Sequence, residues 1–284
     1  MTESELINRI STKYSTMSPA HKRIANVILG DPEAAAFLNV SGLAKEARVS
    51  DSTVTRFATS IGYSGYPALS QQLQAMIKTR LTTKERLEHS QAAISPELPD
   101  VLYMRSIFED LENIQLMVEQ LNGANFLQSV DLIDNAQNVG IICARSTLSL
   151  GLYLEFYLSL LRKPTFVITG DPRTIDYLEH LTTSDVVIAI GFSRYAQSTI
   201  KTLKYCKDIN IPSIVVTDYS ASPLYGLGDV TFLCPAGIPS YMDSLVAPMA
   251  LLQSILRMLS EKSTSVLIQN LSVLENIWTR FDIY

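Results

Sequence analysis

Four short apolar runs in the second half of the chain do most to limit how it can fold. They are VGIIC (139–143), TFVIT (165–169), DVVIAI (185–190) and SIVVT (213–217). None of them alternates apolar with polar residues, which is typical of strands buried on both faces. Segments with helical spacing separate the runs, at 147–162, 173–182 and 196–209. This order predicts an α/β fold with a parallel sheet and right-handed crossovers.

The end of the chain extends this pattern. VTFLC (230–234) is a candidate fifth strand, and two closing helices are expected near 242–261 and 264–279. A length of 284 residues suits two domains. The first 80 residues supply the other domain, because they read as helices throughout. There Ser18 and Pro19 have the residue types of an N-cap and first helical position.

Residues 82–100 are polar, contain two prolines and lack a strand pattern. We interpret them as a linker or a frayed helix end. A helix is expected from about 101 to 121, and its apolar side suits either core packing or a connecting, dimer-forming role. The predicted organisation is therefore a helical domain at 1–80, a linker with a connecting helix at 81–124, and the sheet domain at 125–284.

The segment SGLAKEARVSDSTVTRFATSI (41–61) has the pattern of a helix-turn-helix. Ala44 and Ala47 are small enough for two helices to cross closely, and four apolar residues can fill the junction. These are Leu43, Val49, Val54 and Phe57. Ser50 is expected to cap the second helix by accepting from the amide of Thr53. Arg48 stands in the turn, where positive φ favours glycine at a cost to other residues of about 1 kcal/mol.

Short hydroxyl side chains and one arginine on the second helix could approach base edges in the major groove of DNA. The candidate DNA-binding residues are Lys45, Arg48, Ser50, Ser52, Thr53, Thr55 and Arg56. Residues 1–90 carry 11 basic against 8 acidic side chains in a chain of net charge −5, which permits a polyanion-binding head on an acidic body. The alternative is a plain helical hairpin that binds no DNA.

Two loops that follow predicted strands carry candidate ligand-binding groups. In open parallel sheets, ligands bind beyond the carboxyl ends of the strands, where helix N-termini offer amides to anions. The loops are 143–149 and 191–198, and the candidate effector-binding residues are Arg145, Ser146, Thr147, Ser193, Arg194 and Tyr195. The alternative is that Ser146 and Ser193 only cap the helices that follow.

Several kinds of chemistry are not expected. The chain has no dinucleotide fingerprint, P-loop or nucleophile elbow, and its three histidines lack metal-ligand spacing. We therefore expect no cofactor, no metal and no catalytic residue. Cys143, Cys206 and Cys234 lie far apart and are expected to be buried thiols. The polar N-terminus and the lack of a long apolar run predict a cytosolic protein that does not bind membranes.

Both halves of the chain resemble the RpiR family of bacterial transcriptional regulators. The first match is VSDSTVTRF (49–57) followed by IGYSGY (61–66). The second covers Ser146, the run from Asp185 to Ser193, and Thr217-Asp218. It continues through Ser222-Pro223-Leu224 to Asp243-Ser244-Leu245-Val246. Two loops depart from the family: the first usually reads G-x-G-x-S and the second S-x-S-G-x-T, and both have lost glycine here.

The resemblance implies an N-terminal helix-turn-helix domain followed by a three-layer α/β sugar isomerase (SIS) domain. It further implies a homodimer or homotetramer that binds a double-stranded operator with inverted-repeat symmetry and responds to a small-molecule effector such as a sugar phosphate. We expect a transcriptional regulator, in the first instance a repressor. Two alternatives stay open: a sugar-phosphate isomerase using Glu155 or Glu179, and a metabolite-sensing adaptor that binds no DNA.

Overall fold

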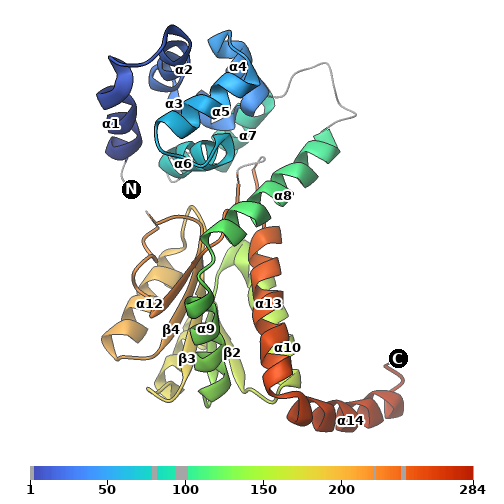
Figure 1. The fold of residues 1–284 in the computed structure, drawn as a ribbon. Coiled ribbons are helices and arrows are strands. Elements are labelled where there is room, and N and C mark those ends of the chain that lie inside the picture. Colours follow the sequence, from blue (N-terminus) through green and yellow to red (C-terminus); the bar gives the residue numbers. More distant parts are fainter. Residues whose placement is uncertain (1–2, 79–81, 94–101, 221, 238–240, 284) are drawn as a thin grey trace. The chain divides into compact units, whose positions relative to one another are not determined.

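The computed structural model describes residues 3–78, 82–93, 102–220, 222–237 and 241–283. Its sheet is made of five parallel strands in the order β2-β1-β3-β4-β5 (Figure 1). The strands are β1 (Val139–Ile142), β2 (Thr165–Ile168), β3 (Val186–Ile190), β4 (Ser213–Thr217) and β5 (Val230–Leu233). The predicted α/β class and all five predicted strands are therefore confirmed.

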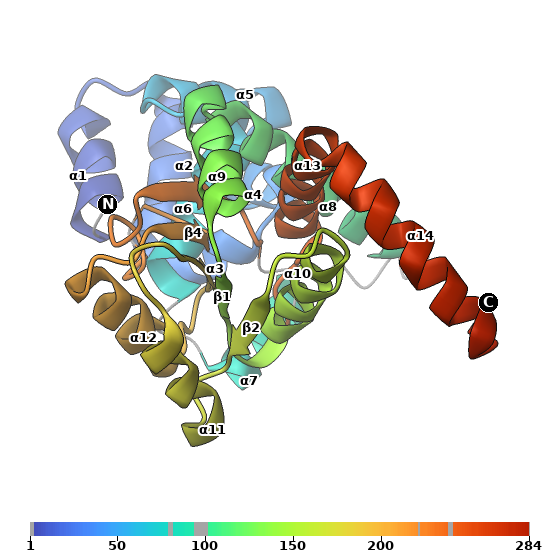
Figure 2. The same cartoon turned by 90° about the horizontal axis from the view of Figure 1, so that it is seen from below.

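The strand order places β1 between β2 and β3, and Figure 2 shows β1 beside β2. The chain leaves β1 through α10 (Leu148–Leu160) to reach β2. It then returns past β1 through α11 (Pro172–Ile175) and a short 3-10 helix (Asp176–His180) to β3. The loops after β1 and β3 therefore start side by side at the same edge of the sheet.

Helices cover the sheet on both faces, which explains why the strands are apolar without alternation. α12 (Gln197–Asp208) packs on one face, where Leu203 belongs to the same buried cluster as Val187 and Ile142. α10 packs on the other, where a Cβ at Gly151 would lie 3.4 Å from Ile141 and only 2.5 Å from the sulfur of Cys143. Glycine at 151 therefore allows α10 its close approach to β1.

The N-terminal helices enclose a core of their own. They are α1 (Glu3–Tyr14), α2 (Pro19–Gly30), α3 (Pro32–Phe37), α4 (Val40–Ala47), α5 (Asp51–Ser60) and α6 (Tyr66–Lys78). Ser18 caps α2 as predicted, accepting from the amide of His21 at 3.3 Å. Leu43, Val54 and Phe57 are fully buried at the junction of α4 and α5. The expected all-α domain is present.

The segment after this core contains a helix, where the sequence predicted a linker or a frayed helix end. Residues Thr83–Ala93 form a helix, α7, while 94–101 lie outside the described residues. The physical reason is an anchor that sequence spacing does not reveal. The Arg86 guanidinium is buried and pairs with Asp243 at 2.8 Å, across 157 residues of chain.

Four longer helices complete the described structure. They are α8 (Leu102–Gln120), α9 (Gly123–Asn135), α13 (Val246–Lys262) and α14 (Thr264–Arg280). Three of them match predicted helices, whereas α9 was not anticipated. The chain divides into two compact units, of which the first contains residues 1–119, 219–221 and 235–246, and the second contains the rest. The domain boundaries proposed at 80 and 124 stay predictions.

Asp185 ties together the amino ends of two strands. Its carboxylate accepts from the amide and side chain of Asn138, before β1, at 2.8 and 2.7 Å. It also accepts from the amide and hydroxyl of Thr182 at 2.6 and 2.9 Å. Burial alone would raise the pKa of Asp185, but these hydrogen bonds outweigh it and hold the pKa below its usual value. The ionised carboxylate thus stabilises this end of the sheet.

We predict that Asp185→Ala lowers the free energy of unfolding by more than about 2 kcal/mol, because buried donors lose a charged acceptor. Since the folded pKa is depressed, the wild-type advantage should be complete above about pH 5 and shrink as the pH falls below about 4. Urea unfolding of both proteins across this range measures it. Asp208→Ala, an exposed change at the end of α12, is the control. A wild-type advantage that persists unchanged at pH 3 would contradict the assignment.

Candidate functional site

The turn between α4 and α5 has the geometry that a helix-turn-helix requires. Arg48 adopts the left-handed conformation (φ 52°, ψ 53°), as expected at this position. The amide of Val49 donates to Ala44 O at 2.9 Å, which closes the turn. Arg23 adds support from α2, because its Nε donates to Ala47 O at 3.0 Å. The arginine at 48 is thus accommodated with its side chain exposed.

The predicted capping bond of Ser50 is wrong, although Ser50 is the N-cap residue of α5. Its hydroxyl makes no bond to the Thr53 amide, which instead donates to the Ser50 carbonyl at 2.9 Å. The hydroxyl lies 2.9 Å from Ser52 Oγ and 2.8 Å from Thr53 Oγ1. The three hydroxyls form a cluster because the Ser52 and Thr53 hydroxyls take the place of the backbone amide as hydrogen-bond partners of Ser50 Oγ.

Helix α5 separates a buried side from a polar side. Val54, Phe57 and Ala58 are buried in the helical core. The opposite side exposes hydroxyl side chains and one arginine, namely Ser52, Thr55, Arg56 and Thr59. Lys45 and Arg48 are also exposed on the preceding helix and turn, and Thr53 is half-buried. The predicted DNA-facing residues therefore gather around one helix and the turn that leads into it.

Arg56 is held along the surface of its own helix. Its Nε donates to Ser52 O and its Nη2 to Ser52 Oγ, both at 3.2 Å. His21 of α2 lies nearby, packed edge-on against Phe57 with ring centroids 5.6 Å apart. Burial, and then the charge of Arg56, lower the pKa of His21. At neutral pH the positive charge of this corner therefore rests on the arginine.

The two predicted effector loops meet at the carboxyl edge of the sheet. Thr147 joins them: its hydroxyl accepts from the amide of Ala144 at 3.0 Å and lies 3.4 Å from Ile190 O, at the end of β3. Its proton also has an acceptor in Ala144 O at 2.9 Å. Thr147 is buried, whereas Arg145 and Ser146 are exposed. Thr147 thus holds the loop, and its two neighbours face solvent.

Both loops place an arginine in the left-handed region. Arg145 has φ 59° and Arg194 has φ 62°. The second position is the one where the family pattern has glycine. The backbone conformation favoured by glycine is therefore present without the glycine, at a cost of order 1 kcal/mol for each residue. Each loop gains a cationic side chain in exchange.

In the second loop, three polar groups converge on Asp218, the residue after β4. The amide and hydroxyl of Ser193 donate to Oδ2 at 3.0 and 2.8 Å, and the Tyr195 hydroxyl donates to Oδ1 at 2.6 Å. Burial, together with the Asp218 charge, raises the pKa of Tyr195, which keeps its proton. Sequence reasoning did not count Asp218 as a site residue; its position directly after a buried strand was the available signal.

The alternative that Ser146 and Ser193 are simple helix caps finds no support in this geometry. The N-cap residue of α10 is Thr147 and that of α12 is Ala196, and neither makes a side-chain cap bond. The hydroxyl of Ser193 is engaged with Asp218 instead. The Ser146 hydroxyl is therefore available for another role at this edge, whereas the Ser193 hydroxyl orders the second loop.

Comparison with known proteins identifies both halves of the chain. Residues 4–80 match the model of the rpiR-family helix-turn-helix domain, and residues 132–258 match that of the SIS domain. The chain belongs to the RpiR family of transcriptional regulators. A Haemophilus influenzae HTH-type transcriptional regulator is 23% identical to it over 229 residues, covering 79% of this chain and 77% of the relative. HexR of Pseudomonas aeruginosa is 24% identical over 225 residues, covering 77% and 75%.

Two solved structures share the fold of this chain. The sugar isomerase domain of an RpiR transcription factor from Sphaerobacter thermophilus superposes with a TM-score of 0.60 at 20% identity. The match covers 62% of this regulator and 99% of that chain. NanR of Vibrio vulnificus, solved with ManNAc-6P, gives a TM-score of 0.59 at 18% identity and covers 98% and 99% of the two chains. Both comparisons therefore support the fold described above.

Other candidate groups of this RpiR-family protein lie elsewhere. Cys143, Cys206 and Cys234 are buried and free, as predicted; burial raises the pKa of Cys143 to about 12 and of Cys206 to about 11. Glu155 is half-buried on α10, and Glu179 is exposed in the short helix before β3. Within the described ranges, no cluster of His, Cys, Asp or Glu is arranged to hold a metal ion. Nor does any described helix have the length and apolar character to cross a membrane.

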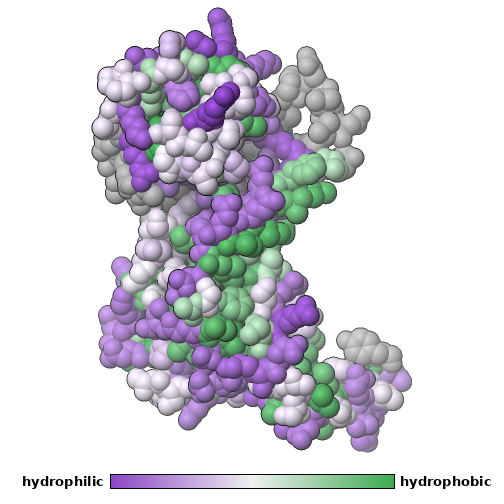
Figure 3. Space-filling model, viewed as in Figure 1, coloured by the Kyte–Doolittle hydropathy of each residue, from purple (hydrophilic) through white to green (hydrophobic). Residues whose placement is uncertain are grey.

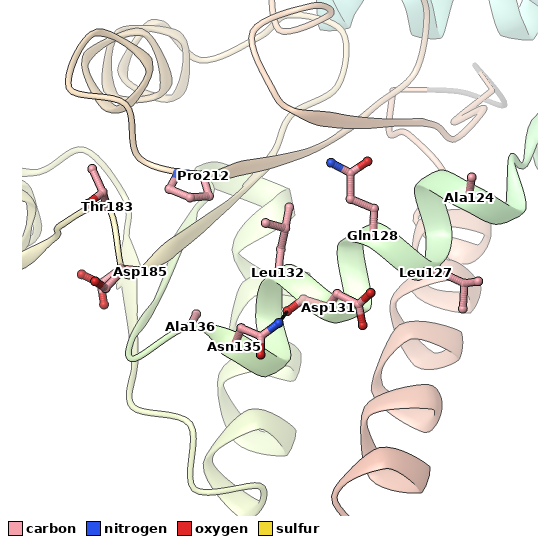
Figure 4. Close-up of a pocket in the computed structure, with 11 residues that line it drawn as sticks. Ala124, Leu127, Gln128, Asp131, Leu132, Asn135, Ala136, Thr183, Asp185 and Pro212 are labelled. Carbon is pink, nitrogen blue, oxygen red and sulfur yellow. Dashed lines mark hydrogen bonds between the residues drawn. The ribbon is translucent and has the colours of Figure 1, made fainter.

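A cavity of about 460 Å³ lies at the other end of the strands (Figure 4). Ala136, Asp185 and Pro212 line it, and they precede β1, β3 and β4 respectively. Thr183 and Ser184 and the α9 face from Ala124 to Asn135 form the remaining wall. This cavity contains none of the predicted effector residues, so it is a feature separate from the carboxyl edge.

We predict that Arg56→Ala weakens specific DNA binding by about 1–3 kcal/mol, because an exposed arginine on α5 can pair with a base edge. Fluorescence anisotropy with an operator duplex, at fixed salt, measures the change. Lys84→Ala, which removes one exposed charge from α7, is the control for general attraction to phosphate. Unchanged affinity in the Arg56 variant would remove this residue from the contact surface.

Proposed function

We propose that the chain represses or activates transcription in the bacterial cytoplasm by binding an inverted-repeat operator, and that a small anionic metabolite controls this binding. The observation that carries the proposal is the pairing of two surfaces in one chain. One is the polar side of α5 in an rpiR-type head. The other is the carboxyl edge of an SIS sheet, where the loops after β1 and β3 meet.

The DNA contact is supported by the shape and chemistry of α5. A recognition helix needs an apolar side that fixes it in the domain and a polar side with short side chains near its N-terminus. Ser52, Thr55 and Arg56 supply the polar side, and Lys45 and Arg48 can reach phosphates from the adjacent turn. A twofold dimer presents two such helices about one DNA turn apart, which calls for an operator of the same symmetry.

The effector is proposed to be anionic, with a sugar phosphate as the leading class. Arg145 and Arg194 bring charge, and Ser146, Ser193 and Tyr195 bring hydroxyl groups to the same edge of the sheet; Thr147 fixes the first loop. Vibrio vulnificus NanR, which shares the fold, was solved with a phosphorylated sugar. Whichever effector binds must favour one arrangement of the DNA heads by a few kcal/mol to change operator occupancy.

We propose binding rather than catalysis at this edge. An aldose–ketose isomerase needs a carboxylate or histidine within reach of the sugar carbons. Glu155 faces the outer side of β2, where it lines two depressions, one with Leu152 and Thr165 and one that extends to Thr169, and Glu179 is exposed to solvent. Neither belongs to the two loops. Asp218, which does contact one loop, is occupied by Ser193 and Tyr195.

The oligomeric state is proposed from the apolar side of α8. Met104, Ile107, Phe108 and Leu111 recur at helical spacing and are 37–56% exposed in the single chain. They form an apolar band that follows α8 in Figure 3. A second apolar series lies on α14, where Val273, Ile277 and Phe281 are exposed at successive turns. We expect copies of the same chain to cover these helices.

The effector site is tested by the double change Ser146→Ala and Ser193→Ala. We expect operator affinity to stay within twofold of the wild type, and the shift produced by the effector to be lost. Anisotropy titrations with and without the metabolite found in a thermal-shift panel of sugar phosphates, free sugars and small acids give both values. A normal effector shift in the double variant would mean that the site lies elsewhere.

The oligomer is tested by placing charges in the apolar band of α8. Ile107→Glu together with Leu111→Glu should convert the protein to a monomer and weaken operator binding at least tenfold, because both half-sites must be bound together. Light scattering after gel filtration reports the mass. Ser106→Glu, an exposed change outside the apolar band of the same helix, is the control. A double variant of unchanged mass would exclude α8 from the subunit interface.

A further inference from the structure

The loop after β3 already binds an anionic group of the protein itself, the Asp218 carboxylate. One oxygen of Asp218 accepts the amide and the hydroxyl of Ser193, at 3.0 and 2.8 Å. The other oxygen accepts the hydroxyl of Tyr195 at 2.6 Å and lies 3.4 Å from Thr217 Oγ1. A backbone amide and side-chain hydroxyls that converge on two oxygens are the arrangement that proteins offer to a phosphate or carboxylate ligand.

This arrangement leaves the loop with few hydrogen-bond donors to offer to a ligand. A serine or tyrosine hydroxyl carries one proton and two acceptor lone pairs. The protons of Ser193 and Tyr195 are directed to Asp218, and so is the amide proton of Ser193. Asp218 is 1% exposed and Ser193 is 6% exposed, so water competes little for these bonds. The hydroxyl oxygens can still accept hydrogen bonds from a ligand.

A phosphate at this position would also meet the charge of Asp218. Two anions a few ångströms apart in a partly buried site repel each other strongly, because little water screens them. The ligand phosphate would have to displace the carboxylate from three well-formed hydrogen bonds. A ligand hydroxyl or ammonium group, in contrast, gains from the same negative charge.

The loop after β1 differs in its hydroxyl group, although both loops carry an exposed arginine. Arg145 and Ser146 are exposed, and among the described residues neither the guanidinium nor the Ser146 hydroxyl has a hydrogen-bond partner. The loop conformation that presents them is fixed from below by Thr147, whose hydroxyl bonds to Ala144. This loop therefore offers a cation and a hydroxyl proton that the protein itself does not use.

We infer that Asp218 acts as an internal anion that excludes phosphate from the β3 loop. The anionic group of the effector then binds to Arg145 and Ser146, and its hydroxyl or ammonium groups face Ser193, Tyr195 and Asp218. This inference rests on the proposed effector site and adds the orientation and chemical class of the ligand. The ligand carries an anionic group at one end and hydrogen-bond donors at the other. Asp218 is a specificity residue in this arrangement.

The first test measures the binding of inorganic phosphate to the full-length protein by isothermal titration calorimetry. Arg145→Gln should weaken phosphate binding at least tenfold. Ser193→Ala should change its affinity by less than twofold, because the Ser193 proton is already engaged. A loss in Ser193→Ala as large as that in Arg145→Gln would overturn the inference and leave the proposed site intact. If neither change alters phosphate affinity, the proposed effector site is overturned as well.

The second test removes the internal charge while keeping its shape. Asp218→Asn should tighten phosphate binding at least tenfold, which corresponds to 1.4 kcal/mol. Adding Ser193→Ala to this variant should abolish the gain, since the freed donors create it. Unchanged or weaker binding by folded Asp218→Asn protein would overturn the inference, as would the absence of phosphate binding to both the wild type and this variant. If Asp218→Asn does not fold, the first test decides alone.

A matched control lies at the other end of β4. Asp229 accepts from the amide and hydroxyl of Ser213 at 2.7 and 3.3 Å, at the opposite end of β4. Asp229→Asn therefore removes the same kind of carboxylate from the same kind of serine contact, away from the effector loops. It should leave phosphate affinity unchanged. A gain in Asp229→Asn equal to that in Asp218→Asn would show a general effect of net charge and would overturn the inference.

Discussion

The parallel pairing of β1 with both β2 and β3 is the constraint on which the rest of the sheet domain depends. Because β1 lies between them, the chain leaves β1 towards β2 and leaves β3 in the opposite direction, towards β4. The loops after β1 and β3 therefore open at the same edge of the sheet. Burial on both faces drives this pairing. Gly151 and Cys143 set how closely α10 approaches, and Thr147 then joins the two loops at their base.

Aspartates at strand ends hold this frame together. Asp185 binds donors before β1 and β3, Asp229 binds Ser213 at the start of β4, and Asp218 binds Ser193 after β3. Each carboxylate accepts hydrogen bonds from a backbone amide and from a hydroxyl or side-chain amide, so the same type of interaction stabilises both ends of the sheet. At the carboxyl end it has a second consequence. The same bonds that order the loop also decide which part of a ligand the loop can receive.

Much of this architecture follows from local patterns, and the remainder depends on contacts distant in sequence. The strands, Ser18 as a cap and the helix-turn-helix follow from spacing and residue type. The helix at 83–93 does not, because its anchor Arg86 pairs with Asp243 across the chain. The role of Ser50 depends on competition among three neighbouring hydroxyls. Asp218 gains its role only when β4 lies beside β3, which no local pattern around position 218 contains.

The central claim is that occupation of the sheet edge changes operator binding by α5. The most direct measurement selects duplexes from a random pool with the full-length protein. It then titrates the enriched sequence with and without each member of a sugar-phosphate panel. The account predicts an inverted repeat and a shift of at least fivefold with one phosphorylated sugar, equal to about 1 kcal/mol of coupling. Enrichment of no sequence, or an operator affinity that no ligand changes although one binds the protein, would contradict it.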